Sequence, residues 1–263
     1  MDHPYTSRFL LLSVAVWAAC SGLPARAEEG WGATLGASSD YVYRGVSLSN
    51  NKPSLQADGH YHGSSDWFAG LGLASAGRAA DDYYTGSSHA AVVDAYLGQA
   101  WVLDEDWSSS LGLTHYDYLG DDPGLYRYDE LGASLAWRHQ AFFSFAASPD
   151  TSTRTYVEEV WSGPQQSAVE RYVSGSKRGP AYTWELVVSQ PLRQGISANA
   201  GAGYRDLKNL EDVGYVYGSA GLAWSHGPWA LNLSRIATSH EAGTLCCGSP
   251  PANRWVLSLL WRR

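Results

Sequence analysis

RWVLSLLWR, residues 254–262, places a large apolar side chain at every second position near the C-terminal end of the chain. Side chains at positions i and i+2 share one face of a β-strand, so a period of two predicts a strand with one apolar face. The same alternation recurs in residues 54–62 and 197–205. These stretches predict an all-β protein. The apolar side of the first stretch consists of Trp255, Leu257, Leu259 and Trp261.

Alternating segments of this kind continue along the chain, and the connections between them are short and long in turn. The short connections are 63–66, 102–106, 138–140, 193–195 and 226–228. Both chain ends fall on the short-turn side, which is typical of a single up-and-down antiparallel transmembrane β-barrel. We expect about twelve strands, within a range of about ten to fourteen for such a barrel. The predicted strands are 31–44, 53–62, 67–75, 91–101, 107–118, 127–137, 141–148, 181–192, 196–207, 215–225, 229–239 and 253–262.

Alternation alone does not say whether the apolar face points inward or outward. The tryptophans favour the outward orientation, because they gather beside the short turns, where a membrane barrel carries an aromatic girdle. The barrel must also be closed, since an open sheet edge would leave its backbone groups unpaired in hydrocarbon. The predicted girdle consists of Trp67, Trp101, Trp107, Trp137, Trp229 and Trp261.

Composition agrees with a β-protein and excludes one class of partner. The chain of 263 residues has 28 glycines and 17 tyrosines but only one methionine, which disfavours a helical fold. Its formal net charge is −8. Nucleic-acid binding requires a basic surface, so we expect no nucleic-acid partner.

The first 27 residues have the form of a secretory signal peptide. Arg8 precedes the apolar residues 9–19, and Ala25-Arg26-Ala27 is a small-x-small cleavage site. We expect cleavage before Glu28, which leaves the barrel as residues 28–263. Acylation of Cys20 in a lipoprotein is the alternative. Beyond the leader, the adjacent Cys246 and Cys247 are either loop thiols or a strained ring, and their role stays open.

One stretch near the start of the barrel carries a family resemblance. SDYVYRGVSLS at residues 39–49, followed by Lys52-Pro53, is similar to the opening signature of the TorF porin family, also described as an uncharacterised exported-protein family. VVDAYLG at 92–98 and LGLTHYDYLG at 111–120 are similar to that family as well. The resemblance is strongest over residues 31–148. It implies an outer-membrane barrel with passive transport and says nothing of the solute.

The polar face of the strands predicts which residues line the lumen. Asp40 and Arg44 share a face of the first predicted strand. They belong either to a charged ladder that narrows a pore or to an ion pair that stabilises barrel closure. Interior charges of both signs predict weak ion selectivity. The residues predicted to line the pore are Asp40, Arg44, Gln56, Asp58, His60, Asp94, Glu130, Glu185, Asn199, Arg205 and Asn232.

Catalytic and metal-binding interpretations are less favoured. His60 and His62 share a face, but no carboxylate at suitable spacing completes a metal site. His115 and Asp117 invite a lipid-hydrolase interpretation, yet parity places them on the apolar face and no serine can be specified. The loop acids at 81–82 and 121–122 are expected to be solvated rather than to bind calcium. We therefore expect no enzymatic activity, no metal and no cofactor.

These observations predict an outer-membrane porin of a Gram-negative bacterium that passes small polar solutes through a narrow lumen. A barrel of about twelve strands lies between filled and open interiors, so the lumen is either narrow or plugged. Residues 149–180 form a long extracellular loop or a plug. A non-conducting structural or adhesive barrel and, less favoured, a lipid-modifying enzyme are the alternatives. The expected partners are outer-membrane lipid, small polar solutes and, during insertion, the barrel-assembly machinery.

Overall fold

A computed structural model describes residues 29–76, 91–119, 127–162, 168–244 and 251–263, with side chains omitted for 153–176. The predicted leader, the cysteine pair and the acids at 81–82 and 121–122 lie outside these residues. Within them, no helix is long and apolar enough to cross a membrane.

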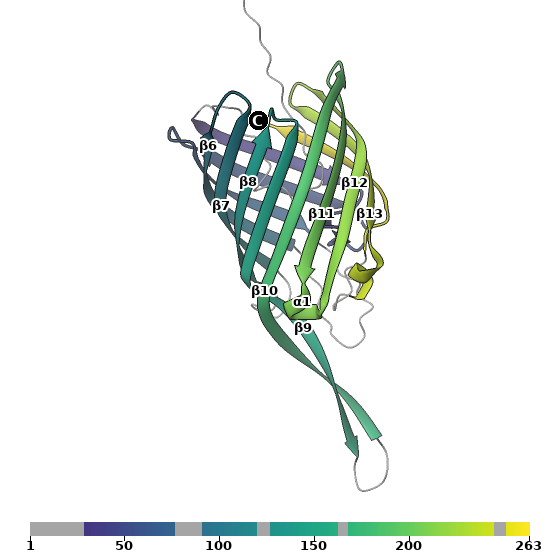
Figure 1. The fold of residues 1–263 in the computed structure, drawn as a ribbon. Coiled ribbons are helices and arrows are strands. Elements are labelled where there is room, and N and C mark those ends of the chain that lie inside the picture. The colour runs from purple at the N-terminus through teal and green to yellow at the C-terminus, as the bar shows by residue number, and fades with distance from the viewer. Residues whose placement is uncertain (1–28, 77–90, 120–126, 163–167, 245–250) are drawn as a thin grey trace, which may run out of the picture.

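Within this part of the chain the strands form a closed antiparallel barrel of twelve strands, which confirms the predicted fold class (Figure 1). Each strand pairs with its neighbour in sequence, and β1 closes the ring by pairing with both β4 and β14. The strands are β1 (Gly30–Ser38), β4 (Ser54–His62), β5 (Trp67–Ser75), β6 (Ala91–Val102), β7 (Trp107–Leu119), β8 (Tyr128–Trp137), β9 (Ala141–Ser162), β10 (Ala168–Arg193), β11 (Ile196–Leu207), β12 (Val213–His226), β13 (Trp229–Thr238) and β14 (Arg254–Arg262).

Closure of the ring extends to the last residue. The backbone amides of Ala33 and Arg263 each donate to the carbonyl of the other at 2.9 Å. Leu35 faces Trp261 across one edge of β1 and Ala57 across the other. Both edges of β1 are thereby paired, so the ladder leaves no open edge at the seam between the first and last strands.

The short turns, the start of β1 and the C-terminus lie at one rim, at the top in Figure 1, and β1 ends at the other. Tight turns of this kind need left-handed backbone. Gln194 and Gly195 supply it between β10 and β11, with φ of 50° and 80°. The short helices α1 (Lys208–Glu211) and η1 (His240–Thr244) occupy the opposite rim. We call these the short-turn rim and the long-loop rim.

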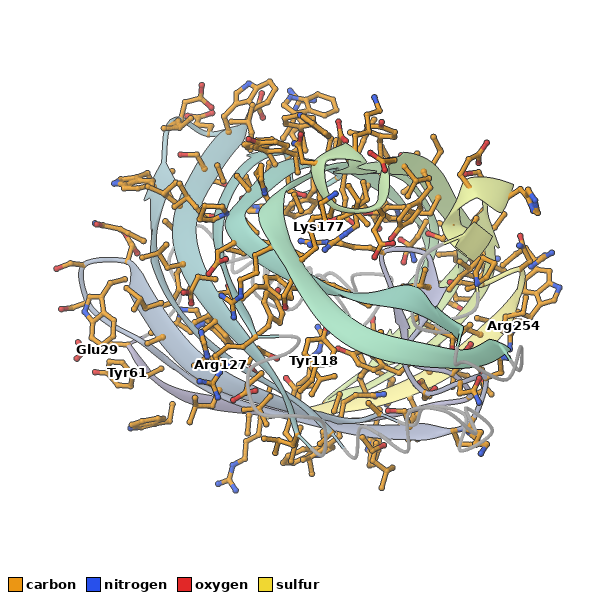
Figure 2. The ribbon with its side chains drawn as sticks, turned by 90° about the horizontal axis from the view of Figure 1, so that it is seen from below. Glu29, Tyr61, Tyr118, Arg127, Lys177 and Arg254 are labelled. Atoms are coloured by element: carbon orange, nitrogen blue, oxygen red, sulfur yellow. The ribbon has the colours of Figure 1, made fainter. Side chains whose placement is uncertain are left out.

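The barrel is apolar outside and largely polar or tyrosine-rich inside. Along β14, Leu257 is 47% exposed on the outer face, whereas its neighbour Ser258 is 7% exposed on the inner face. Viewed from the long-loop rim, Tyr118 lies inside the ring of strands while Tyr61 lies outside it (Figure 2). An outer face of leucine and tryptophan is the polarity of a barrel that lies in lipid.

Strands β9 and β10 continue well past the long-loop rim. They pair out to Ser162 and Ala168, with one irregularity between Gly179 and Ala181. The resulting two-stranded extension points away from the barrel (Figure 1). Within residues 149–180, the described parts 149–162 and 168–180 are therefore strand, and they do not add a separate pair of spanning strands.

The first predicted strand, 31–44, is too long. β1 ends at Ser38, and residues 39–53 turn into the lumen around a small hairpin of β2 (Val42–Tyr43) and β3 (Val46–Ser47). Arg44 and Gly45 form its turn with φ of 48° and 81°. We call residues 39–53 the inner hairpin. Alternation continues through SDYVYRG, so the period of two could not reveal where the wall ends.

Candidate functional site

The inner hairpin fills the part of the lumen near the long-loop rim by packing against several walls at once. Tyr41 packs on Ala74 and Val92 of β5 and β6. Val42 packs on Ile236 and Val256 of β13 and β14. Tyr43 faces two tyrosines of β7 and β8, and Val46 joins a cluster from β10, β11 and β12. A segment that contacts walls around the ring in this way narrows the lumen from its centre.

A buried ion pair ties the tip of the inner hairpin to β8. The Nη1 and Nη2 atoms of Arg44 each donate to one carboxylate oxygen of Glu130 at 2.7 Å. The two residues are only 6% and 7% exposed. The guanidinium also lies 4.7 Å from the centre of the Tyr43 ring. Arg44 therefore pairs across the lumen with Glu130, and does not pair with Asp40.

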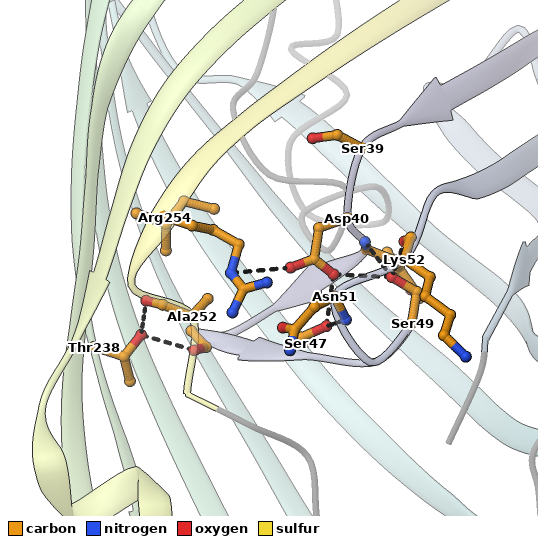
Figure 3. A network of polar contacts seen from close by, with 12 residues as sticks. Ser39, Asp40, Ser47, Ser49, Asn51, Lys52, Thr238, Ala252 and Arg254 are labelled. Atoms are coloured by element: carbon orange, nitrogen blue, oxygen red, sulfur yellow. Dashed lines mark hydrogen bonds and ion pairs between the residues drawn. The ribbon is translucent and has the colours of Figure 1, made fainter. Parts of the chain in front are cut away.

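Asp40 organises the base of the inner hairpin (Figure 3). Its Oδ1 accepts hydrogen bonds from the hydroxyls of Ser47 at 2.5 Å and Ser49 at 2.8 Å. Its Oδ2 lies 3.5 Å from Nε of Arg254, on β14. The Ser49 Oγ accepts a further bond from the Tyr41 amide at 2.8 Å. One carboxylate thus links both arms of the inner hairpin to the last strand of the barrel.

The turn of the inner hairpin is also fixed by hydrogen bonds from Thr238 of β13 and from Ala252, which precedes β14. The Gly45 carbonyl accepts from the Ala252 amide at 2.7 Å and lies 2.7 Å from the Thr238 hydroxyl. A Cβ at Gly45 would stand 2.5 Å from the Cβ of Tyr217 and 2.7 Å from the Thr238 Oγ1. Both the left-handed φ and the lack of space require glycine at this turn.

Tyrosines dominate the lumen around the inner hairpin. The rings of Tyr116 and Tyr128 stack 4.7 Å apart, and the Tyr43 hydroxyl lies 3.3 Å from that of Tyr128. Tyr217 donates to Glu185 at 2.7 Å on the opposite wall. The four tyrosines were not among the residues predicted to line the pore. Their signal was present, since interior parity puts bulky aromatics on an otherwise polar or small face.

A hollow on the short-turn side leads to this cluster. Its charged lining is Arg44, Glu130 and Glu185, and its remaining wall consists of small residues together with larger apolar and aromatic ones. Tyr96 and Phe68 narrow it on one side. The lumen therefore contains a hollow on the short-turn side of the inner hairpin. The small lining residues are Ser110, Gly112, Gly132, Ala133, Ser144 and Ala146.

The other residues predicted to line the pore lie on inner faces of strands. Asp58 accepts from Tyr96 at 2.8 Å and lies 2.6 Å from Nδ1 of His60. Gln56 donates to Ser38 and Ser54. The two predicted residues that lie in the inner hairpin rather than on the wall are Asp40 and Arg44. The remaining inner-face residues are Asp94, Glu130, Glu185, Asn199, Arg205 and Asn232.

The predicted girdle residues lie beside the short turns on the outer face, most of them exposed and Trp261 half-buried. Trp31 belongs with them but was missed. It is 83% exposed and its ring lies 5.2 Å from that of Tyr61. Its position at the very start of the first strand, on the short-turn side, was the available signal.

His115 and Asp117, which invited a hydrolase interpretation, each pair with a different neighbouring side chain. His115 lies on the outer face with Nδ1 2.7 Å from Asp129, and Asp117 pairs with Arg127 at 3.0 Å. Among the residues with described placement, no three His, Cys, Asp or Glu side chains gather as metal ligands.

A salt bridge joins two neighbouring short turns. Arg138 Nε and Nη2 donate to the Asp106 carboxylate at 2.8 and 3.0 Å. These hydrogen bonds lower the pKa of Asp106, although both side chains are exposed.

Comparison with solved structures supports the barrel fold. A membrane protein solved in a study of in-meso crystallization is 9% identical, with a TM-score of 0.50 over 89% of this chain and 83% of that one. The KdgM porin (5% identity, TM-score 0.49, 88% and 98% coverage) and the toluene transporter TodX of P. putida (10%, 0.43, 90% and 90%) are more distant in fold. At these identities the likeness concerns the fold alone. No curated protein matches the sequence significantly.

One family model matches most of the chain. Gcw_chp, described as a bacterial protein of unknown function, matches residues 26–248, which includes nearly the whole barrel. This match does not confirm the TorF name, which rested on the motifs at 39–49, 92–98 and 111–120. The chain therefore belongs to the Gcw_chp family of bacterial proteins of unknown function.

Proposed function

We propose that this protein is a narrow porin of the outer membrane, similar to the TorF family, through which small polar solutes diffuse past the inner hairpin. Its outer face is apolar and girdled by tryptophan, which suits lipid, and its lumen carries charge and hydroxyls. The observation on which the proposal rests is the Arg44–Glu130 pair, a buried charged contact between the inner hairpin and the wall of a polar lumen.

The proposed localisation follows from the barrel itself. A closed barrel with an apolar outer band is the architecture of outer-membrane proteins of Gram-negative bacteria, which arrive by a cleaved leader and the barrel-assembly machinery. Residues 1–27 are the proposed leader. Release of the mature chain starting at Glu28 would support this route, and a mature N-terminus at Cys20 would contradict it.

Single-channel recording in planar bilayers tests the transport proposal. We expect the refolded protein to give discrete conductance steps of small size. Replacing residues 40–51 by a short Gly-Ser linker removes the inner hairpin, so the unit conductance should rise by about threefold or more as the lumen widens toward an open barrel. The matched control shortens the β9–β10 extension at 153–176, which lies outside the lumen, and should leave the conductance unchanged.

A non-conducting structural barrel is the second candidate, because the inner hairpin packs on several walls and is bonded at both its tip and its base. In that case neither the wild type nor the hairpin-deleted variant conducts, although both refold as barrels. That result would refute the porin proposal. A lipid-modifying enzyme is not proposed, since His115 pairs with an exposed acid on the outer face.

A further inference from the structure

One cation of the lumen has no acid in contact with it. Arg205 lies on the inner face of β11 and is only 8% exposed. Its Nη1 atom has no hydrogen-bond partner, and Arg205 takes part in no ion pair among the described residues. A buried guanidinium without a partner is unfavourable, because the interior solvates charge much less well than water does. Such a group is therefore prepared to accept an anion.

The surroundings of Arg205 do not neutralise its charge. The groups that act on it electrostatically are Arg44, of like charge, and Tyr43, Tyr128 and Tyr215, which are neutral phenols. Glu130 senses Arg205, but each of its two oxygens already accepts a hydrogen bond from Arg44 at 2.7 Å. Among the described residues of this cluster, Arg44 Nε also has no hydrogen-bond partner, but the charge of Arg44 is paired with Glu130, whereas no carboxylate pairs with Arg205.

Arg205 lines neither of the two hollows described in the lumen, but Arg44, whose charge acts on Arg205, lines both. A second hollow is lined by Arg44, Glu185 and Gly201, together with residues of β12 and β13. Gly201 lies four residues before Arg205 on the same face of β11. Because glycine has no side chain, this part of the wall does not project into the hollow. A small molecule in this hollow would therefore lie beside Arg44 and on the short-turn side of Arg205 along β11.

We propose that Arg205 is the anchor of an anion subsite that binds the carboxylate of a small polar solute as it passes the inner hairpin. This inference rests on the proposed function for its context. A guanidinium offers a planar pair of N–H donors that matches a carboxylate. A carboxylate carries one negative charge, which Arg205 balances. A doubly charged phosphate would leave excess negative charge beside Glu130 and Glu185, so a carboxylate is favoured over phosphate.

The test measures binding separately from transport. Refolded protein in detergent micelles is titrated with sodium acetate at constant ionic strength, with sodium chloride as the replacement salt. Saturation transfer from the protein to the acetate methyl group, measured by NMR, reports occupancy. We expect a saturable acetate isotherm in the wild type and an affinity at least tenfold weaker in Arg205→Gln. Arg205→Lys should lose less affinity, because it keeps the charge but not the planar pair of N–H donors of the guanidinium. The matched control is Arg193→Gln, which removes an exposed arginine at the short-turn rim and should bind acetate like the wild type.

Each outcome supports or overturns the subsite. Equal acetate affinity in the wild type and Arg205→Gln overturns it, and so does inorganic phosphate binding as tightly as acetate. If Arg205→Gln fails to refold, Arg205→Lys decides, because an unchanged affinity there shows that the guanidinium fork does not bind the ligand. Acetate binding by a wild-type protein that does not conduct refutes the porin proposal and leaves the subsite standing. Conductance without Arg205-dependent acetate binding overturns the subsite and leaves the porin proposal standing.

Discussion

Replacing Glu130 by glutamine should loosen the inner hairpin, since it leaves the Arg44 guanidinium buried without its counter-charge. The pair makes two charge-assisted hydrogen bonds of 2.7 Å, and both residues are less than a tenth exposed. At about 4 Å between charge centres and an effective dielectric constant near 20, the Coulomb attraction is about 4 kcal/mol. Measured losses for one partner of a buried pair are about 3–5 kcal/mol. We therefore expect the free energy of unfolding to fall by about 3 kcal/mol or more.

The assay is equilibrium unfolding of the refolded barrel in urea, followed by tryptophan fluorescence. Loss of the pair should lower the midpoint while leaving the slope nearly unchanged. The control is Asp106→Asn, which removes one partner of an exposed Arg–Asp pair at the short turns. Exposed pairs contribute little, so this variant should unfold close to the wild type.

A double variant separates the pair from its parts. Replacing both Arg44 and Glu130 by methionine removes both charges together, so no buried charge is left unpaired, and stability should return most of the way to the wild type. The same recordings that test transport should show larger current fluctuations in Glu130→Gln alone, as the inner hairpin leaves its docked position. A Glu130→Gln protein within about 0.5 kcal/mol of the wild type, the usual scatter of surface substitutions, would refute this account of how the inner hairpin is held.

Three further outcomes can be checked by unfolding. Gly45→Ala should destabilise the protein by about 2 kcal/mol, because the backbone there has a left-handed φ and the added Cβ would contact Tyr217. Gly59→Ala is the control and should not destabilise, because the space around its added Cβ is open. Equal effects of the two substitutions would contradict the tight fit at the Gly45 turn. Leu113→Arg, at mid-height on the outer face, should lower the free energy of unfolding in lipid vesicles by about 2–4 kcal/mol. Leu119→Arg, near the rim, should lower it by only about 0–1 kcal/mol. Similar losses in the two variants would argue against a bilayer at the height of Leu113. Hydrogen bonds from Arg138 lower the pKa of Asp106 in the folded state, so the contribution of this carboxylate to the free energy of unfolding should be fully present above its unfolded pKa of about 3.9. That contribution should be lost as the pH falls through the folded pKa, so Asp106→Asn should lose less stability than the wild type over this range. Identical pH profiles of stability would show that the pair contributes nothing.

Most of the wall could be predicted from sequence because its determinants are local. Each strand carries its own alternation, and each short turn carries its own glycine or polar residues, so the strand predicted at 67–75 is found at those bounds and that predicted at 91–101 is longer by one residue. The predicted inner-face residues also followed from parity alone. The cluster of Tyr116 and Tyr128 obeys the same parity, yet nothing local indicates that the two rings stack.

The inner hairpin could not be predicted because its determinants are distant in the chain. Arg44 meets Glu130 across 86 residues, and the Thr238 hydroxyl meets Gly45 across 193. Local alternation favours a strand that continues through residue 44. The inward turn of the chain is stabilised only by these contacts with residues distant in the sequence. The extension of β9 and β10 was missed for a related reason. Beyond the lipid band its strands need no apolar face, so the pattern that marks the other strands is missing there.

The position of the inner hairpin in the chain imposes an order on biogenesis. It follows directly after β1, yet three of the groups that fix it, Thr238, Ala252 and Arg254, belong to the last part of the chain to be synthesised. Until β14 has joined β1, these three groups cannot hold the hairpin, so its full set of contacts forms only after the barrel has closed. A nascent molecule that stalls before its final strand would lack these contacts, and complete docking of the inner hairpin would mark the molecules whose barrel has closed.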